Sequence, residues 1–230
     1  MTSEPEKPKK PVGGSIRTVD LSTDPAQRVL ALCGMVAPAS ILLSALVLAM
    51  LTPNYSHAAN TLSELGAQGA PYATYFNAVM IVAGLLIVAF AVGLHRDIGG
   101  GNGSTKGPGL VAAFGLFATV GTGATPLDLE STAPINLIHI GFVLIGFLSL
   151  AAGMYVVSFR MATDSRWDGY ARITRWWSVL LLLLFSGWFV ALFAVPLEPG
   201  ESPNGALQRP FVVWTLLWIE LTAIKLFSRR

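Results

Sequence analysis

Charged residues are scarce in this chain. Only 12% of its 230 residues are Asp, Glu, Lys or Arg, whereas 53% are hydrophobic. A water-soluble domain of this length usually carries about 25% charged residues. The deficit excludes an ordinary soluble domain and indicates a protein that folds in lipid. The formal net charge of +2 is too small to indicate a nucleic-acid partner.

Cysteine and histidine are nearly absent as well. The single Cys33 excludes an intrachain disulfide and a cysteine-based metal site, and its place in an apolar run indicates a small core residue. Three histidines are too few to ligate two haems across a membrane. The sequence has no Walker loop and no H-E-x-x-H, G-x-S-x-G or C-x-x-C motif. We therefore expect no cofactor and assign no catalytic residue.

The first 28 residues are polar and rich in Pro, Lys and Glu. Such a segment cannot bury enough apolar surface to offset the entropy lost on ordering. We expect a disordered cytoplasmic tail over residues 1–28, followed by a single transmembrane domain over residues 29–228. We do not expect a signal peptide, because the apolar run that follows is long enough to stay in the bilayer.

Long apolar runs are what the chain has in abundance. Each is about 17–25 residues long, which is the length of a helix that crosses a bilayer. Backbone groups in hydrocarbon must be satisfied within the segment, so each run should be a helix. The sequence predicts an all-α, six-helix polytopic membrane bundle with helices at about residues 29–51, 74–94, 109–125, 135–159, 176–195 and 211–227.

The basic residues predict the orientation of the bundle. With the N-terminus in the cytoplasm, fourteen of the fifteen Lys and Arg residues fall on the inner side, and only Arg209 falls outside. Cytoplasmic segments carry such an excess of positive charge. The pattern predicts that both termini are cytoplasmic. The inner residues are Lys7, Lys9, Lys10, Arg17, Arg28, Arg96, Lys106, Arg160, Arg166, Arg172, Arg175, Lys225, Arg229 and Arg230.

The stretch HAANTLSELGA lies between the first two helices. Thr61 and Glu64 match a capping box, in which each side chain accepts a hydrogen bond from the backbone N–H of the other residue. This pattern predicts a short outer helix at about Leu62–Ala67 that lies across the mouth of the bundle. It leaves His57 and Ser63 unexplained, and both are candidates for a ligand pocket.

Four polar residues near the outer helix ends extend this candidate pocket. His139 lies about one turn inside the fourth helix and shares a face with Asn136. It is either a histidine hydrogen-bonded between helices or a ligand contact, proton carrier or metal ligand. Asp128 precedes His139 across a tight turn, so the two could form a polarised pair, a metal site or a turn lock. Asn77 either bonds to a neighbouring helix or completes the rim.

Glu220 stands near the middle of the last helix. A carboxyl group at that depth is costly, and intramembrane carboxylates are often functional. Lys225 is five residues further on and can extend to the inner interface, and no Lys or Arg lies at matching depth in the other helices. Glu220 is therefore either a neutral or paired structural carboxyl group or a proton-coupled or ligand-binding one.

These outer-turn residues resemble a known family. NTLSELGA, PYATYFN, GLLIVAFAVGL, VGTGATPLD and IH follow one another in this order. Over roughly residues 30–200 they resemble the bacterial and archaeal membrane proteins grouped as domain of unknown function 998. The resemblance implies a six-helix membrane fold without an established activity. The matching positions are Ser63, Leu65, Gly66, Phe76, Asn77, Gly84, Gly121, Pro126, Asp128 and His139.

The function expected from these features is binding or movement of a lipid-like or small amphiphilic molecule at the outer leaflet of the plasma membrane. One alternative is a membrane-embedded metal-dependent hydrolase, with His57, Asp128 and His139 as ligands and Glu64 as base. A second alternative is an accessory subunit of a membrane complex. Membrane lipids are the expected partners, and the sequence leaves the oligomeric state open.

Overall fold

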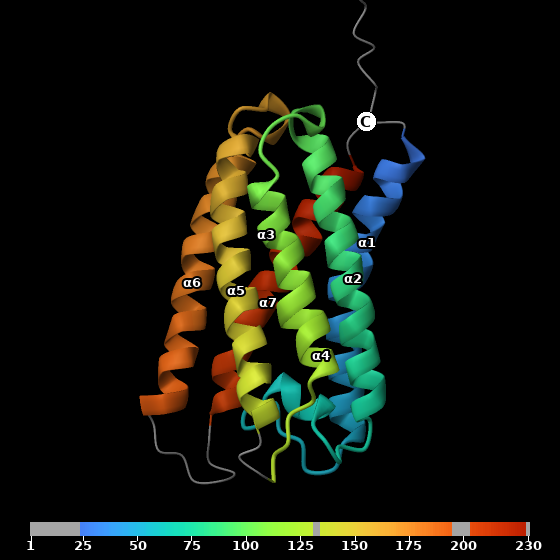
Figure 1. Ribbon diagram of the computed structural model, residues 1–230, viewed down its shortest axis with the longest axis vertical. Coiled ribbons are helices and arrows are strands. Elements are labelled where there is room, and N and C mark those ends of the chain that lie inside the picture. The colour runs from blue at the N-terminus through green and yellow to red at the C-terminus, as the bar shows by residue number, and fades with distance from the viewer. Residues whose placement is uncertain (1–23, 131–133, 195–202, 229–230) are drawn as a thin grey trace, which may run out of the picture.

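The computed structural model describes residues 24–130, 134–194 and 203–228, so most of the predicted tail lies outside the described residues. Within them every regular element is a helix, and six helical spans are long and apolar enough to cross a membrane. The predicted all-α, multi-pass bundle is confirmed. Figure 1 shows the spans running side by side along the long axis of the molecule.

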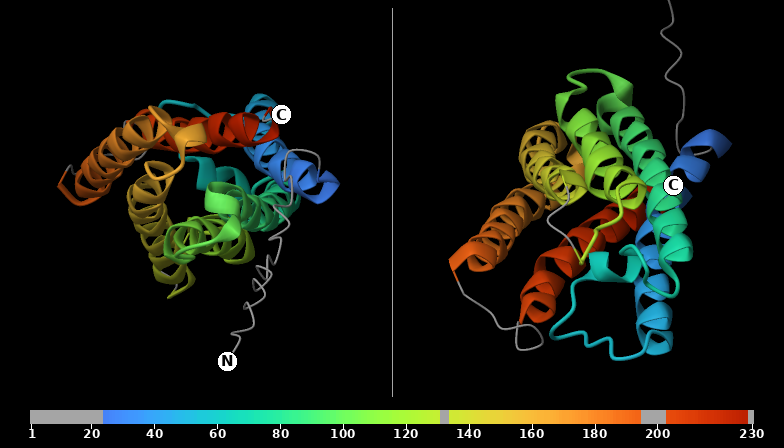
Figure 2. Two further views of the ribbon diagram at one scale, coloured as in Figure 1. Left: turned by 90° about the horizontal axis from the view of Figure 1, so that it is seen from above. Right: turned by 60° about the horizontal axis from the view of Figure 1, so that its bottom comes forward.

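The six spans close into a ring. α1 packs against α2 and α7, α3 packs against α2 and α5, and α6 packs against α5 and α7. Figure 2 shows this arrangement from above. The bounds are α1 Pro25–Leu51, α2 Ala73–Asp97, α3 Lys106–Phe114, α4 Thr122–Ala124, α5 Pro134–Met161, α6 Tyr170–Ala194 and α7 Asn204–Phe227.

The third span is not a continuous α-helix. Between α3 and α4 the chain forms a π-helix, η4 (Gly115–Gly121). The sequence predicts one uninterrupted helix over residues 109–125. The apolar composition of a run does not distinguish an α-helix from a π-helix. A π-helical turn shifts every later side chain around the axis. The π-helix therefore determines whether the side chains of Thr119 and Thr122 point into the bundle.

Close backbone contacts hold η4 against its neighbours. A Cβ built on Gly84 of α2 would lie 2.5 Å from the carbonyl oxygen of Gly115, and one built on Gly115 would lie 2.6 Å from that of Gly84. Side chains at these positions would overlap the facing backbone. Small residues of this kind let membrane helices pack closely.

The last helix begins earlier than predicted. The sequence places its start at residue 211, because Pro210 usually breaks a helix, but α7 begins at Asn204. The amide groups in its first turn are satisfied by the loop after α1, since Gly205 N donates to Ala59 O at 3.3 Å and Ala206 N donates to Ala58 O at 2.8 Å. The additional helical residues are stabilised because a loop that is distant in sequence caps them.

The start of α1 and the end of α7 lie at one end of the bundle, here called the termini end (Figure 1). Ion pairs and carbonyl contacts hold its loops. Arg166 lies 2.7 Å from Asp164 and 3.6 Å from Asp97, and Asp97 also accepts from Trp167 Nε1 at 2.8 Å. Its Arg160 donates to three loop carbonyl oxygens at 2.7–2.8 Å. These basic side chains therefore stabilise the loops.

Candidate functional site

A cavity lies between the spans near the opposite end of the bundle. Its lining comes from all the spans except α6, together with the short 3₁₀ helix η2 (Leu62–Gly66). The empty space, counted out to the open mouth, is about 730 Å³. The lining residues are Ile41, Leu62, Ser63, Gly66, Phe76, Asn77, Met80, Phe114, Ala118, Thr119, Thr122, Gly123, His139, Val143, Phe147, Gln208, Phe211, Val212, Thr215 and Leu216.

The η2 helix, here called the roof, is tied to three spans. Ser63 Oγ lies 3.2 Å from His139 Nε2 on α5, and the Gly66 carbonyl accepts from Asn77 Nδ2 on α2 at 2.8 Å. Leu62 N donates to Gln208 of α7 at 2.7 Å. Three anchors on three different helices fix the roof over the cavity.

The capping pair predicted from the sequence starts the roof helix. Glu64 Oε1 accepts from the backbone N–H of Thr61 at 2.7 Å and from its hydroxyl at 3.0 Å. Asn60 Nδ2 donates to the second oxygen of Glu64 at 2.6 Å. Glu64 is thus engaged in the turn before the roof, as the capping interpretation requires. The short helix itself is a 3₁₀ helix that ends at Gly66.

Tyr55 and Arg209 brace the edge of the roof. The Tyr55 hydroxyl donates to Thr61 O at 2.9 Å and accepts from Arg209 Nη2 at 2.7 Å. Burial raises the pKa of the Tyr55 hydroxyl, and the nearby Arg209 charge opposes this shift. Arg209 is the basic residue that the charge pattern isolated from all the others, and here it links the first loop to α7.

His139 is buried, with 4% of its surface exposed, and both of its ring nitrogens have partners. Nδ1 lies 2.7 Å from the carbonyl oxygen of Thr125. Because a carbonyl oxygen only accepts, Nδ1 carries the proton. In the neutral imidazole Nε2 then accepts from the Ser63 hydroxyl. His139 therefore orients Ser63 and joins α5 to the roof.

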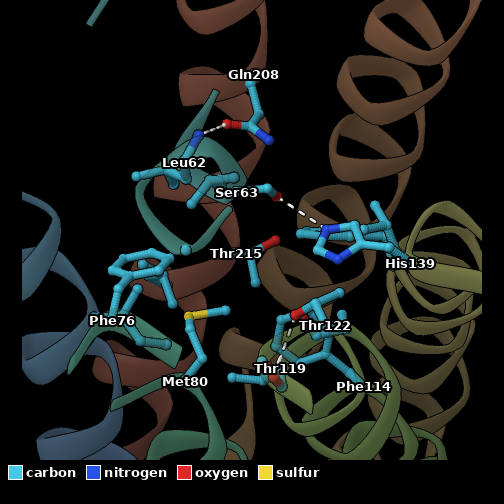
Figure 3. Close-up of a pocket in the computed structure, with 18 of the residues that line it drawn as sticks. Leu62, Ser63, Phe76, Met80, Phe114, Thr119, Thr122, His139, Gln208 and Thr215 are labelled. Atoms are coloured by element: carbon cyan, nitrogen blue, oxygen red, sulfur yellow. Dashed lines mark hydrogen bonds between the residues drawn. The ribbon is translucent and has the colours of Figure 1, made fainter. Parts of the chain in front are cut away.

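Thr215 presents the least satisfied group in the cavity wall. Thr215 is 1% exposed, and its hydroxyl oxygen has no hydrogen-bond partner in the described structure. In Figure 3 this oxygen points toward the space between Ser63 and His139. A buried hydroxyl group without a partner costs about 1–3 kcal/mol. Thr215 therefore lacks a partner at the place where an occupant of the cavity would lie.

Half of the predicted pocket residues line the cavity: Ser63, Asn77 and His139. Asn136 instead locks the turn between α4 and α5, because its amide donates to Asp128 O and accepts from Asp128 N, both at 2.8 Å. The Asp128 carboxylate accepts from Glu130 N at 3.1 Å. These contacts lock the turn through Asn136, whereas each alternative drawn from the sequence paired Asp128 with His139.

His57 lies outside the cavity lining. Its ring meets the Tyr55 ring edge to face, with 5.5 Å between centroids, and its Nδ1 lies 3.5 Å from Arg209 Nη2. Among the described residues, no group of three or more His, Cys, Asp or Glu side chains is placed to hold a metal ion. The suggested set of His57, Asp128 and His139 therefore does not form such a group.

Glu220 also lies outside the cavity lining. It is half-buried between the exposed residues Leu217 and Leu221 of α7, and its Oε2 atom is buried without a hydrogen-bond partner in the described structure. The carboxyl group is thus separate from the cavity. A proton pathway that links the two has no support in this arrangement.

Four polar residues that line the cavity were not predicted from the sequence: Thr119, Thr122, Gln208 and Thr215. Gln208 lies before the expected start of the last helix, and the two threonines of the third span depend on the π-helix. Thr215 stands alone in an apolar run whose periodicity does not mark an inner face. One signal was available, since polar residues in membrane helices usually face other helices.

The fold and the roofed cavity define a class, namely a multi-pass helical membrane protein with a roofed pocket near one end of its bundle. The model of the family described as protein of unknown function (DUF998) matches residues 35–225. The chain belongs to this family, and the match includes the last helix, which the resemblance over residues 30–200 did not reach. No curated protein and no solved structure matches the chain.

Proposed function

We propose that this protein binds a lipid-like or small amphiphilic molecule in the roofed cavity. The observation that carries the proposal is the composition of the wall, in which aromatic and aliphatic side chains make up most of the surface and a few hydroxyl and amide groups gather beneath the roof. Pockets of this kind bind molecules with an apolar body and a small polar group. The described lining contains no Asp, Glu, Lys or Arg.

Native mass spectrometry of the gently extracted protein tests this proposal. Val143 of α5 lines the cavity, whereas Ile145 on the same helix is 47% exposed. We expect a bound molecule in the wild type and in the matched control I145F, and its loss in V143F, which fills the cavity. T119L reduces the same space from the third span and should also lose the bound molecule. Equal occupancy in all four proteins, or none in the wild type, would contradict the proposal.

We further propose that the protein lies in the plasma membrane with both termini cytoplasmic and the roof outside. The supporting observation is the charge distribution. Gln68 beside the roof and Ala162 at the termini end both have exposed side chains. In a C33A background, a membrane-impermeant maleimide added to intact cells should label Q68C but not A162C. Labelling of A162C alone would mean that the orientation is reversed.

A further inference from the structure

The charge and hydrogen-bond inventory of the cavity indicates what kind of polar group it accepts. His139 is the one titratable side chain in the described lining, and both of its ring nitrogens are engaged. A charged group brought among these side chains would lose its hydration without an ion-pair partner, which is costly in a low-dielectric site. The wall therefore disfavours carboxylates, phosphates and ammonium groups.

The charged residues around the roof do not change this conclusion, because they are engaged elsewhere. Glu64 accepts from Asn60 and Thr61. Arg209 donates to Tyr55, to Gly205 O at 3.4 Å and to Gln208 Oε1 at 3.2 Å. Neither charged residue belongs to the cavity lining.

Two hydroxyl groups below the roof, those of Ser63 and Thr215, remain able to bind a ligand. The Ser63 proton goes to His139 Nε2 in the neutral imidazole, which leaves the lone pairs of the Ser63 oxygen as acceptors. The Thr215 hydroxyl has no partner in the described structure, so it offers a donor and an acceptor. Figure 3 shows both oxygens facing the same space below the roof.

A ligand hydroxyl is complementary to this pair. It can accept from Thr215 and donate to Ser63, whereas an ether or a carbonyl group can only accept. The apolar remainder of the ligand would pack among Phe76, Phe114 and Phe147. We infer that the cavity selects an uncharged lipid alcohol whose hydroxyl group binds to Thr215 beneath the roof. This inference rests on the proposed function.

The inference can be tested with a set of ten-carbon compounds. A decanol derivative with a diazirine in its chain is crosslinked to the protein in nanodiscs, and the labelled residues are mapped by mass spectrometry. We expect labels on the cavity segments of α5 and α7, displaced best by decanol. Decyl methyl ether should compete about fivefold more weakly, the effect of one hydrogen bond, and decanoate and decylammonium more weakly still.

Variants at one position assign the recognition to Thr215. T215V replaces the hydroxyl by a methyl group of similar size and should weaken decanol competition about fivefold, whereas T215S should restore it. E220Q, on the same helix but outside the cavity, is the matched control and should compete like the wild type. Because the Thr215 hydroxyl has no partner in the described structure, T215V should keep or raise Tm, whereas a purely structural Thr215 would give a lower Tm.

The outcomes separate the two proposals. Absence of labelling at the cavity with every compound would overturn the proposed function together with this inference. Cavity labelling that decanoate or decyl methyl ether displaces as well as decanol does would retain the bound amphiphile and overturn selection of an alcohol. Equal decanol competition in T215V and the wild type would also overturn the inference.

Discussion

At the residue scale, Asn77 shows how one side chain holds the roof. Its Nδ2 donates to the Gly66 carbonyl at 2.8 Å, and a Cβ added to Gly66 would overlap the Asn77 side chain. This contact therefore requires a hydrogen-bond donor at the end of side chain 77 and a residue without a side chain at position 66. The two residues were matched in the sequence as separate motif positions, and the structure shows that they form one contact.

N77D tests this contact with an almost isosteric change. An aspartate cannot donate to the Gly66 carbonyl and places a negative charge against it, so we expect a loss of about 1–3 kcal/mol and a fall in Tm of several degrees. Thermal unfolding of the purified variant measures this. N54D, at an exposed position in the loop that contains the roof, is the control and should unfold like the wild type. An unchanged Tm for N77D would show that the contact does not hold the roof.

At the element scale, the third span packs closely against the backbone of its neighbours. Its π-helical segment approaches α2 at Gly84 and Gly115 and approaches α5 at Gly146, where a Cβ would overlap Ala118. Three glycines on three spans thus set the distance between these helices. The cavity wall formed by Thr119 and Thr122 follows from this close approach.

G115A should therefore be destabilising, because the added methyl group meets the Gly84 carbonyl oxygen. Overpacking of this kind costs about 1–3 kcal/mol, or a Tm several degrees lower. G141A is the matched control: a Cβ added to Gly141 of α5 would have nothing within 4 Å, and alanine is the better helix former by about 1 kcal/mol. A Tm for G115A at or above that of G141A would show that η4 can move away from α2.

At the scale of the whole molecule, the two ends of the bundle are held by different kinds of contact. Hydrogen bonds from three helices fix the roof, whereas ion pairs fix the loops at the termini end. The Arg166 guanidinium donates to Asp164 and holds the pKa of that carboxyl group well below its usual range, assisted by the backbone N–H groups of Gly99 and Arg166. Through its contact with the Gly99 N–H, the Asp164 carboxylate connects the loop after α2 with the loop before α6.

The termini end should therefore give the protein an acid-dependent stability. Asp164 has a lower pKa in the folded chain than the value of about 4 in an unfolded chain. Its stabilisation is therefore present above about pH 4 and is lost as the pH falls toward the folded pKa. D164N should lower Tm at pH 7 by a few degrees, consistent with about 1 kcal/mol for a partly exposed pair. The difference in Tm between D164N and the wild type should shrink between about pH 4 and pH 2.

Thermal unfolding of the wild type and D164N across this pH range measures the effect. D168N changes an exposed carboxylate in the same loop, where the Asp168 side chain accepts from the neighbouring Gly169 N–H, and it should follow the wild type. A difference between D164N and the wild type that stays constant down to about pH 2 would show that the carboxyl group contributes through its shape alone.

Short stretches of the sequence are enough to predict the solvent in which this protein folds, the number of its spans and the asymmetry of its basic residues. Each of these depends on local composition, because the length of an apolar run and the sign of a loop charge do not require knowledge of the neighbouring helices. The capping pair Thr61 and Glu64 belongs to the same group, since its partners are three residues apart. Such features follow from short stretches of the chain taken one at a time.

The tertiary structure alone decided which polar groups meet. Asp128 and His139 are close in sequence, yet His139 bonds to Thr125 and Ser63, while Asp128 bonds to residues of its own turn. Thr215 was not predicted, because its position in the wall depends on how α7 is rotated against α1 and α6. Helix rotation, the π-helix and the position of the roof are set by contacts between distant segments, and a single sequence does not encode those contacts as a local pattern.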